Sequence, residues 1–328
     1  MVCTESWILR RTSNMLRLIK IIVSAGLIAA LVWTVEWNEI YSHVHEFSRI
    51  PALTAVLLLT MQYPVSAWKW QKSLKLHGVD YPLGYLLRIL CIAFFFNNFL
   101  PSAIGGDAYR AYRTFEHADR PAYPISSIIV ERVIGIVVLA LLGYISAVTL
   151  VATGTLPYKQ ELILASAAMG IFVLLFLIAW KAGFLTKMEN RLHKISKLEP
   201  LMESIRIMRA NRRHLWVLIG MSVLFQGIAI SAIISLFSAL ALPGKIFESG
   251  FTGAAAGVAG VIPLSINGIG IVEGSFAVAA ILVGLPYAQA VIVALFVRVF
   301  GLVASILFGI LYLFERGANS ASNQGNSA

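Results

Sequence analysis

The stretch from Phe96 to Arg110, FNNFLPSAIGGDAYR, interrupts a long apolar run of the chain. It contains two amides, a proline, a glycine pair, a carboxylate and a guanidinium, and charged groups are rare and costly inside a bilayer. Irregular backbone at membrane depth is tolerated only where protein or water satisfies its polar groups. We therefore expect this segment to turn inside the protein and to line a wetted cavity. An ordinary cytoplasmic loop after a hydrophobic helix is the alternative.

The composition is that of an integral membrane protein. The chain has 328 residues, of which 59% are hydrophobic and 13% charged, and its mean hydropathy is +0.81. Soluble domains are about 25% charged. The apolar runs are long and unbroken rather than alternating, which favours helices over a closed barrel. The sequence thus predicts an all-α polytopic protein that forms a single membrane domain over residues 1–328.

The apolar runs predict six full crossings and two shorter segments broken by Pro, Gly and polar residues. About 20 apolar residues are needed to cross a hydrocarbon core about 30 Å thick. The first run ends without a small-residue cleavage pattern, so we interpret it as a retained helix and not as a secretory signal. The crossings lie at residues 16–35, 50–70, 125–152, 161–181, 215–242 and 288–314, and the broken segments, predicted to be re-entrant hairpins, at 83–105 and 251–285.

The distribution of Lys and Arg supports this threading. With both hairpins re-entrant, 21 of the 26 basic residues fall on one side of the membrane. Only Arg49, Lys159 and Lys245 fall on the other, and Arg132 and Arg298 stay within it. The positive-inside rule then places both termini in the cytoplasm. The net charge of +10 is therefore attributed to membrane topology, and we expect no nucleic-acid partner.

Three further segments have predicted surface roles. Residues 184–214 combine an amphipathic stripe with many basic residues, which is typical of a helix lying on anionic inner-leaflet headgroups. Residues 317–328 are predicted to be a flexible tail. Trp68, Lys69 and Trp70 are typical of an anchor at the membrane interface. Cys3 and Cys91 have no metal-ligand neighbours, so no disulfide, metal site or cofactor is expected.

Two stretches from different halves of the chain resemble each other. VERVIGIVVLALLG runs from Val130 to Gly143, and FVRVFGLVASILFG from Phe296 to Gly309. Both contain Arg-Val-x-Gly, and both have a broken segment upstream. Each half then has three crossings, an odd number, so the second copy must be inverted relative to the first. We predict an inverted repeat with halves at about residues 16–152 and 161–314, an architecture that recurs in transporters.

Four charged residues fall inside predicted membrane segments: Glu131, Arg132, Glu273 and Arg298. Each costs at least about 2.5–3.5 kcal/mol at a helix centre, so mutual pairing or a hydrated site is required. One interpretation is that the two glutamates only neutralise the two arginines. The other is that they belong to a substrate route, because a guanidinium binds phosphate through paired, charge-assisted hydrogen bonds.

The second interpretation defines a candidate translocation site. We expect its polar residues to come from both hairpins and from the helices that follow them: Asn97, Asn98, Asp107, Arg110, Glu131, Arg132, Ser265, Asn267, Glu273 and Arg298. The backbone turns are expected at Pro101, Gly105, Gly106, Pro263, Gly268 and Gly270. A glycine-rich turn with exposed N–H groups also forms a small anion-binding concavity.

At these residues the chain resembles the flippase-like domain family, which includes the transmembrane region of lysylphosphatidylglycerol synthase/flippase proteins. Three motifs carry the resemblance, at Asn97–Arg110, Glu131–Gly135 and Pro263–Gly274. The resemblance implies movement of lipids or lipid-linked headgroups between leaflets of a bacterial cytoplasmic membrane. Relatives usually have a basic residue where this chain has Val272, and a glycine pair where it has Asn267 and Gly268, so the headgroup preference is not carried over.

The leading functional prediction is a flippase or scramblase for an anionic phospholipid or a polyprenyl-phosphate-linked headgroup. The sequence lacks a Walker motif, and the soluble aminoacyl-transfer domain of the synthases does not appear in it, so we expect no enzyme activity. A membrane enzyme with Asp107 or Glu273 as general base is one alternative. An accessory subunit that works with envelope-biosynthesis enzymes is another.

Overall fold

The computed structural model is helical throughout the part of the chain that it describes. The described residues are 22, 23, 26, 27, 33, 48–99, 105–115, 122–154, 156, 158–181, 206, 207, 210–242, 245–262 and 264–325. The predicted crossing at residues 16–35 and the basic segment at 184–214 therefore lie mostly outside the described residues, and Pro101 and Pro263 lie wholly outside them.

Five helices are long and apolar enough to cross a membrane, and they match five of the six predicted crossings. Their observed bounds extend the predicted ones by up to eleven residues at an end, most of all in the last helix. The five are α3 (Arg49–Leu76), α6 (Ala122–Thr153), α7 (Lys159–Lys181), α10 (Arg212–Ala239) and α13 (Tyr287–Gly325).

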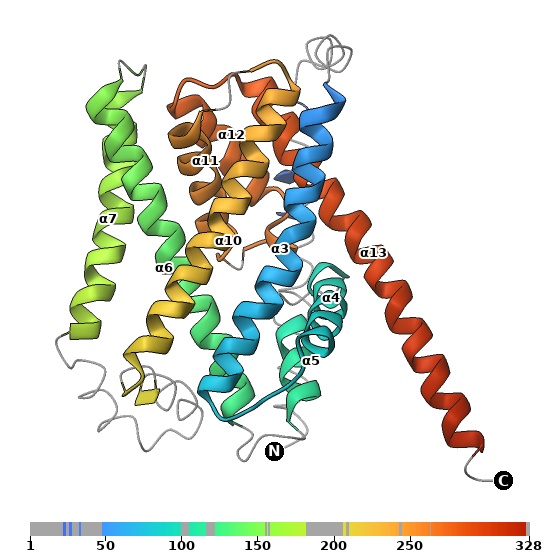
Figure 1. Cartoon of the computed structure of the whole chain (residues 1–328). Helices are drawn as coiled ribbons and strands as arrows, with labels where there is room; N and C mark the ends of the chain where they lie inside the picture. Colours follow the sequence, from blue (N-terminus) through green and yellow to red (C-terminus); the bar gives the residue numbers. More distant parts are fainter. Residues whose placement is uncertain are drawn as a thin grey trace, which may run out of the picture.

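These five helices alternate in direction, and their packing places α6 at the centre. In Figure 1, α3, α7 and α13 run downward, whereas α6 and α10 run upward. α3 packs on α10, and α6 packs on α7, α3 and α10. The basic ends predicted to share one side are consistent with this order, since α3 ends, α6 begins and α10 begins at the lower end of the molecule (Figure 1).

The first broken segment is a pair of short helices, α4 (Leu83–Phe99) and α5 (Gly105–Thr114), which pack on each other. α4 ends just before Leu100 and Pro101, as expected because a residue that precedes proline avoids the helical conformation. Gly106 lets the two backbones touch, because a Cβ there would lie 2.1 Å from the carbonyl oxygen of Ala93.

The second broken segment consists of α11 (Ile246–Ala259), the short 3-10 helix η2 (Ile266–Gly268) and α12 (Ile271–Leu282). Its tip needs left-handed backbone, with φ of 48° at Asn267, 71° at Gly268 and 83° at Gly270. Glycine adopts this conformation without strain, and asparagine tolerates it better than most residues. The glycine hinges predicted from the sequence therefore lie where the chain changes direction.

The two hairpins approach each other from opposite ends of the helix bundle. Figure 1 shows α4 and α5 in the lower half and α11 and α12 in the upper half. The tip of the first hairpin contacts the tip of the second through α4 and η2. This arrangement is the one expected of two re-entrant segments. The inverted repeat itself is taken up with the proposed function.

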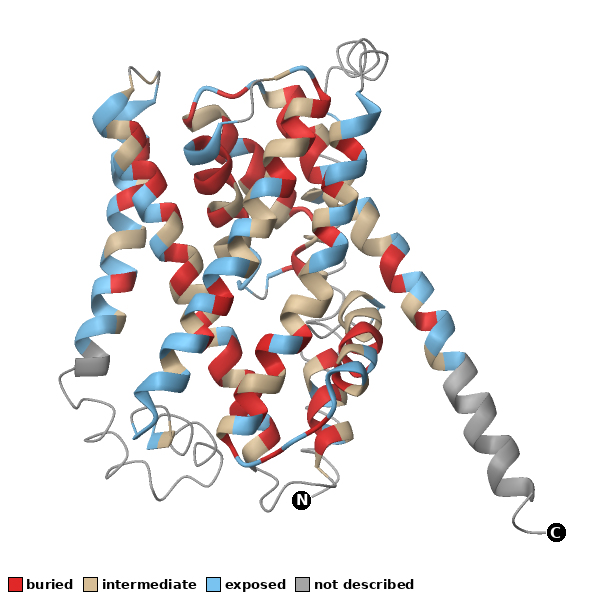
Figure 2. Cartoon of the chain, in the orientation of Figure 1, coloured by how far each residue is buried: buried red, intermediate tan, exposed pale blue. Residues whose placement is uncertain are grey.

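The outward faces of the bundle are apolar. Large side chains such as Leu57, Leu164, Leu175 and Trp216 are at least 60% exposed, and Figure 2 shows exposed residues along the outer sides of α7 and α10. Contiguous exposed apolar surface of this kind is rare on soluble proteins. Together with the five long helices, it identifies a multi-pass integral membrane protein.

Replacing Gly106 with alanine should destabilise the first hairpin, because the new Cβ would meet the backbone of α4. Overpacking of this kind costs about 1–3 kcal/mol. Gly84 is the matched control, since it lies in the same hairpin and a Cβ there would meet nothing within 4 Å. Unfolding in mixed detergent–SDS micelles should show G106A below wild type and G84A close to it. Equal stability of G106A and G84A would contradict the close packing of α4 on α5.

Candidate functional site

A buried cluster of ionised side chains lies where α3, α5 and α6 meet. Glu131 on α6 is at its centre and pairs with Arg110 on α5. Lys69 on α3 approaches the same carboxylate at 3.7 Å, and Ser66, one turn earlier, donates to it at 3.5 Å. Lys69, Arg110 and Glu131 are each no more than 7% exposed. Two cations therefore share one buried anion.

The neighbouring residue on α6, Arg132, pairs with a different carboxylate. Its Nε lies 2.5 Å from Oδ2 of Asp107, in the first turn of α5. Arg132 is about half exposed, whereas the carboxylate of Asp107 is largely covered. We call the five residues of this region the first charge cluster: Lys69, Asp107, Arg110, Glu131 and Arg132. With three cations and two anions, the cluster carries one surplus positive charge.

The aromatic floor of the cluster corrects one prediction from the sequence. Trp70 is fully buried, and the guanidinium of Arg110 stacks 4.2 Å from the centroid of its ring. The Trp70 Nε1 donates to the hydroxyl of Ser127 on α6 at 3.4 Å. The interpretation of Lys69 and Trp70 as an interfacial anchor is wrong, because both face the interior and contact α5 and α6. Trp68 is 43% exposed, as an anchor should be.

The second hairpin carries a second, smaller set of charges. Glu273 on α12 pairs with Arg298 on α13 and also accepts from the backbone N–H of Gly270 at 2.7 Å. Arg298 additionally donates to the carbonyl oxygen of Asn267 at 3.3 Å. Glu273 therefore caps its own helix and holds the arginine at the same time. We call Glu273 and Arg298 the second charge pair; its net charge is zero.

The tips of the hairpins connect the two sets. Asn267 on η2 donates to the side chain of Asn98 on α4, which in turn donates to Ser305 on α13. Within the first hairpin, Asn97 accepts from the backbone N–H of Gly106 at 2.8 Å. Polar contacts thus extend from one hairpin tip to the other, between the first charge cluster and the second charge pair.

The two halves of the chain use one pairing pattern. Asp107 is the third residue of α5, and Glu273 is the third residue of α12. Each carboxylate contacts the Nε of an arginine on the following long helix, Arg132 in one half and Arg298 in the other. The spacing is 25 residues in both halves, from 107 to 132 and from 273 to 298.

The predicted neutralisation of arginines by glutamates is therefore half correct. Glu273 pairs with Arg298 as expected, but Glu131 pairs with Arg110 and Lys69, and Arg132 is left to Asp107. Adjacent residues on a helix point about 100° apart, so Glu131 and Arg132 face different neighbours. The equal 25-residue spacing of acid and arginine was the sequence signal that identifies the correct partner.

Two buried polar atoms near these contacts have no hydrogen-bond partner among the described residues. They are the hydroxyl oxygen of Ser265, just before η2, and the Nε of Arg110. A buried polar group without a partner costs free energy unless water or a ligand satisfies it. Both groups are thus available to bind something that enters the site.

A cavity of about 220 Å³ lies beside the first charge cluster. Its polar lining comes from Gln62, Tyr63 and Ser66 on α3, and α13 closes it at Val297 and Gly301. Ser66 also contacts Glu131, so the cavity borders the buried charges. The expected wetted space is therefore found next to the predicted site, but different residues line it: Asn97, Asn98, Asp107 and Arg110 are not among them.

The fold and the site together define a class: a polytopic α-helical membrane protein whose interior polar centre is built by two broken hairpins. The family described as the lysylphosphatidylglycerol synthase transmembrane region matches residues 17–309. The chain belongs to that family, as its motifs predicted.

One curated relative supports this assignment. It is a UPF0104 membrane protein of Methanocaldococcus jannaschii, and the two sequences are 27% identical over 233 residues. The matched region covers 68% of this chain and 95% of the relative. The similarity therefore extends over most of the membrane domain and includes nearly all of the relative.

Proposed function

We propose that the protein is a flippase or scramblase that moves an anionic lipid between the leaflets of a membrane. The observation that carries this proposal is the set of polar contacts that joins two hairpins from opposite ends of the bundle. A headgroup could pass along these residues while its hydrocarbon chains remain in the bilayer. Anionic phospholipids and polyprenyl-phosphate-linked sugars both have the phosphate that arginine recognises.

The charge balance favours an anionic headgroup. The first charge cluster has a surplus positive charge and includes Arg132, which is about half exposed. A phosphate that displaces Asp107 from Arg132 would exchange one carboxylate for another oxyanion, with little change in charge at the guanidinium. At the second charge pair the same exchange would release Glu273 from Arg298. Each arginine could thus bind the headgroup in turn.

We also propose that the two halves form an inverted repeat with both termini on the cytoplasmic side of a bacterial inner membrane. The shared pairing of acid and arginine at a 25-residue spacing supports the repeat. The concentration of Lys and Arg on one predicted side supports the orientation. In this arrangement the basic segment 184–214 would contact anionic headgroups of the inner leaflet.

The carboxylates considered for an enzyme mechanism favour transport instead. Asp107 and Glu273 are both ion-paired with arginine, which holds a carboxylate ionised but occupies the oxygens a general base would need. A role beside envelope-biosynthesis enzymes is compatible with transport, because such enzymes would consume the lipid on the far leaflet.

Reconstitution tests the proposal. Purified protein in vesicles of phosphatidylethanolamine and phosphatidylglycerol should make inner-leaflet, fluorescently labelled phosphatidylglycerol accessible to external dithionite. Protein-free vesicles and vesicles with an unrelated helical membrane protein are the controls. Loss of the label without chemical change in the lipid supports transport, and a new lipid product would support an enzyme. If neither labelled phosphatidylglycerol nor labelled polyprenyl phosphate moves faster than in the controls, the proposal is wrong.

A further inference from the structure

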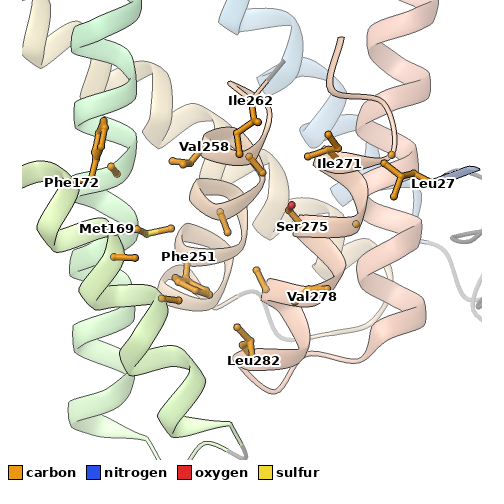
Figure 3. Close-up of a pocket in the computed structure, with 18 residues that line it drawn as sticks. Leu27, Met169, Phe172, Phe251, Val258, Ile262, Ile271, Ser275, Val278 and Leu282 are labelled. Carbon is orange, nitrogen blue, oxygen red and sulfur yellow. The ribbon is translucent and has the colours of Figure 1, made fainter. Parts of the chain in front are cut away.

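A second cavity, of about 730 Å³, lies between the second hairpin and helices α6 and α7. Figure 3 shows its lining, in which Met169 and Phe172 of α7 face Phe251 and Val258 of α11. Its volume is in the usual range of small-molecule sites, roughly 300–1,000 Å³. The labelled side chains in Figure 3 are apolar except for Ser275.

The shape of the cavity follows from the spacing of small residues. On α12 its lining residues recur every three or four positions from Ile271 to Leu282, so they form one stripe about 17 Å long at 1.5 Å per residue. Gly274 and Ala279 lie in this stripe, and Ala255 faces them from α11. Small side chains leave the space that larger ones would fill, and the result is an elongated slot.

One end of the slot reaches the polar contacts of the hairpin tip. Gly270 lines the slot, and its backbone N–H donates to Glu273, the partner of Arg298. The slot also opens outward, since Phe172, Ile262 and Val278 are each about half exposed. In a membrane that opening faces hydrocarbon. An occupant with an apolar chain and a polar end would therefore fit the slot from Leu282 to Gly270.

We infer that this slot binds one acyl chain of a glycerophospholipid, with the lipid's polar end at Gly270 beside the second charge pair. The lining is apolar, the opening faces the acyl chains of the bilayer, and burying each methylene contributes about 0.8 kcal/mol. The assignment of the polar end rests on the proposed function. Binding of the chain does not, because it depends on the slot alone.

Photolabelling tests this inference. Full-length protein in vesicles of phosphatidylethanolamine and phosphatidylglycerol is irradiated with phosphatidylglycerol that carries a diazirine on one acyl chain. We expect peptides with Met169, Val258 and Val278 to be labelled. Gly274→Phe should reduce labelling of these peptides at least tenfold, because its side chain fills the slot. A Cβ at position 274 meets nothing within 4 Å, and leaving glycine favours a helix, so the variant should fold.

Gly227→Phe is the matched control. Gly227 lies on α10, away from the slot, and a Cβ there also meets nothing within 4 Å. It should label as wild type does. Equal labelling of G274F and G227F, or wild-type labelling confined to other peptides, would overturn the inference. So would labelling of the slot by a diazirine polyprenyl phosphate alone. Because labelling needs no transport, absence of translocation would count against the proposed function and not against the slot.

Discussion

Alanine at Arg132 or at Arg298 should lower the rate of phosphatidylglycerol translocation in proteoliposomes by about tenfold to a hundredfold. Each guanidinium is expected to bind the phosphate during its passage, and a hydrogen bond to a charged group contributes about 1.5–3 kcal/mol. At 1.4 kcal/mol per tenfold change, this gives the stated range. The dithionite assay measures it directly, with each variant reconstituted at the same protein-to-lipid ratio.

The controls separate loss of binding from loss of folding. Arg213→Ala removes the same charge from the exposed start of α10 and should transport as wild type does. Because R298A leaves Glu273 buried without its partner, the paired variants R298A/E273A and R132A/D107A are tested as well. If a paired variant elutes as a folded protein yet translocates lipid at the wild-type rate, that arginine does not carry the headgroup.

The architecture could be predicted because a bilayer constrains sequence strongly. Long apolar runs must be helices, and Pro101, Pro263 and the neighbouring glycines marked where two of them break. The sorting of Lys and Arg then required both broken segments to return to their own side. Helix ends were less accurate. α3 continues to Leu76, beyond the predicted crossing, because Trp70 and Leu74 pack in a buried cluster with Leu86 of α4.

The site could be predicted only in part, because its partners are far apart in the sequence. Intramembrane charge identified Glu131, Arg132, Glu273 and Arg298, and polar turns identified the hairpin tips. Lys69 was missed, because Trp-Lys-Trp near the end of an apolar run is typical of a membrane interface. Its partner Glu131 lies 62 residues later (69 to 131), and no local pattern reports a contact that only the packing of α3 on α6 creates.

Glutamine at position 131 should destabilise the protein more than any other single substitution considered above. Glu131 is the one carboxylate shared by Lys69 and Arg110, and all three side chains are buried. Removing one partner of a buried ion pair costs about 3–5 kcal/mol, since the remaining charge is left uncompensated. We expect unfolding of E131Q in mixed detergent–SDS micelles at a much lower SDS fraction than wild type, with a free-energy difference in this range.

A second substitution distinguishes uncompensated charge from a local packing defect. In K69M/E131Q one of the two stranded cations is also removed, so the double variant should recover part of the lost stability, and a double-mutant cycle should show coupling between the two positions. Glu161→Gln, at the exposed start of α7, should change stability by no more than about 0.5 kcal/mol. If K69M adds its own destabilisation to that of E131Q, then Lys69 is not held by Glu131, and the first charge cluster is not a single electrostatic unit.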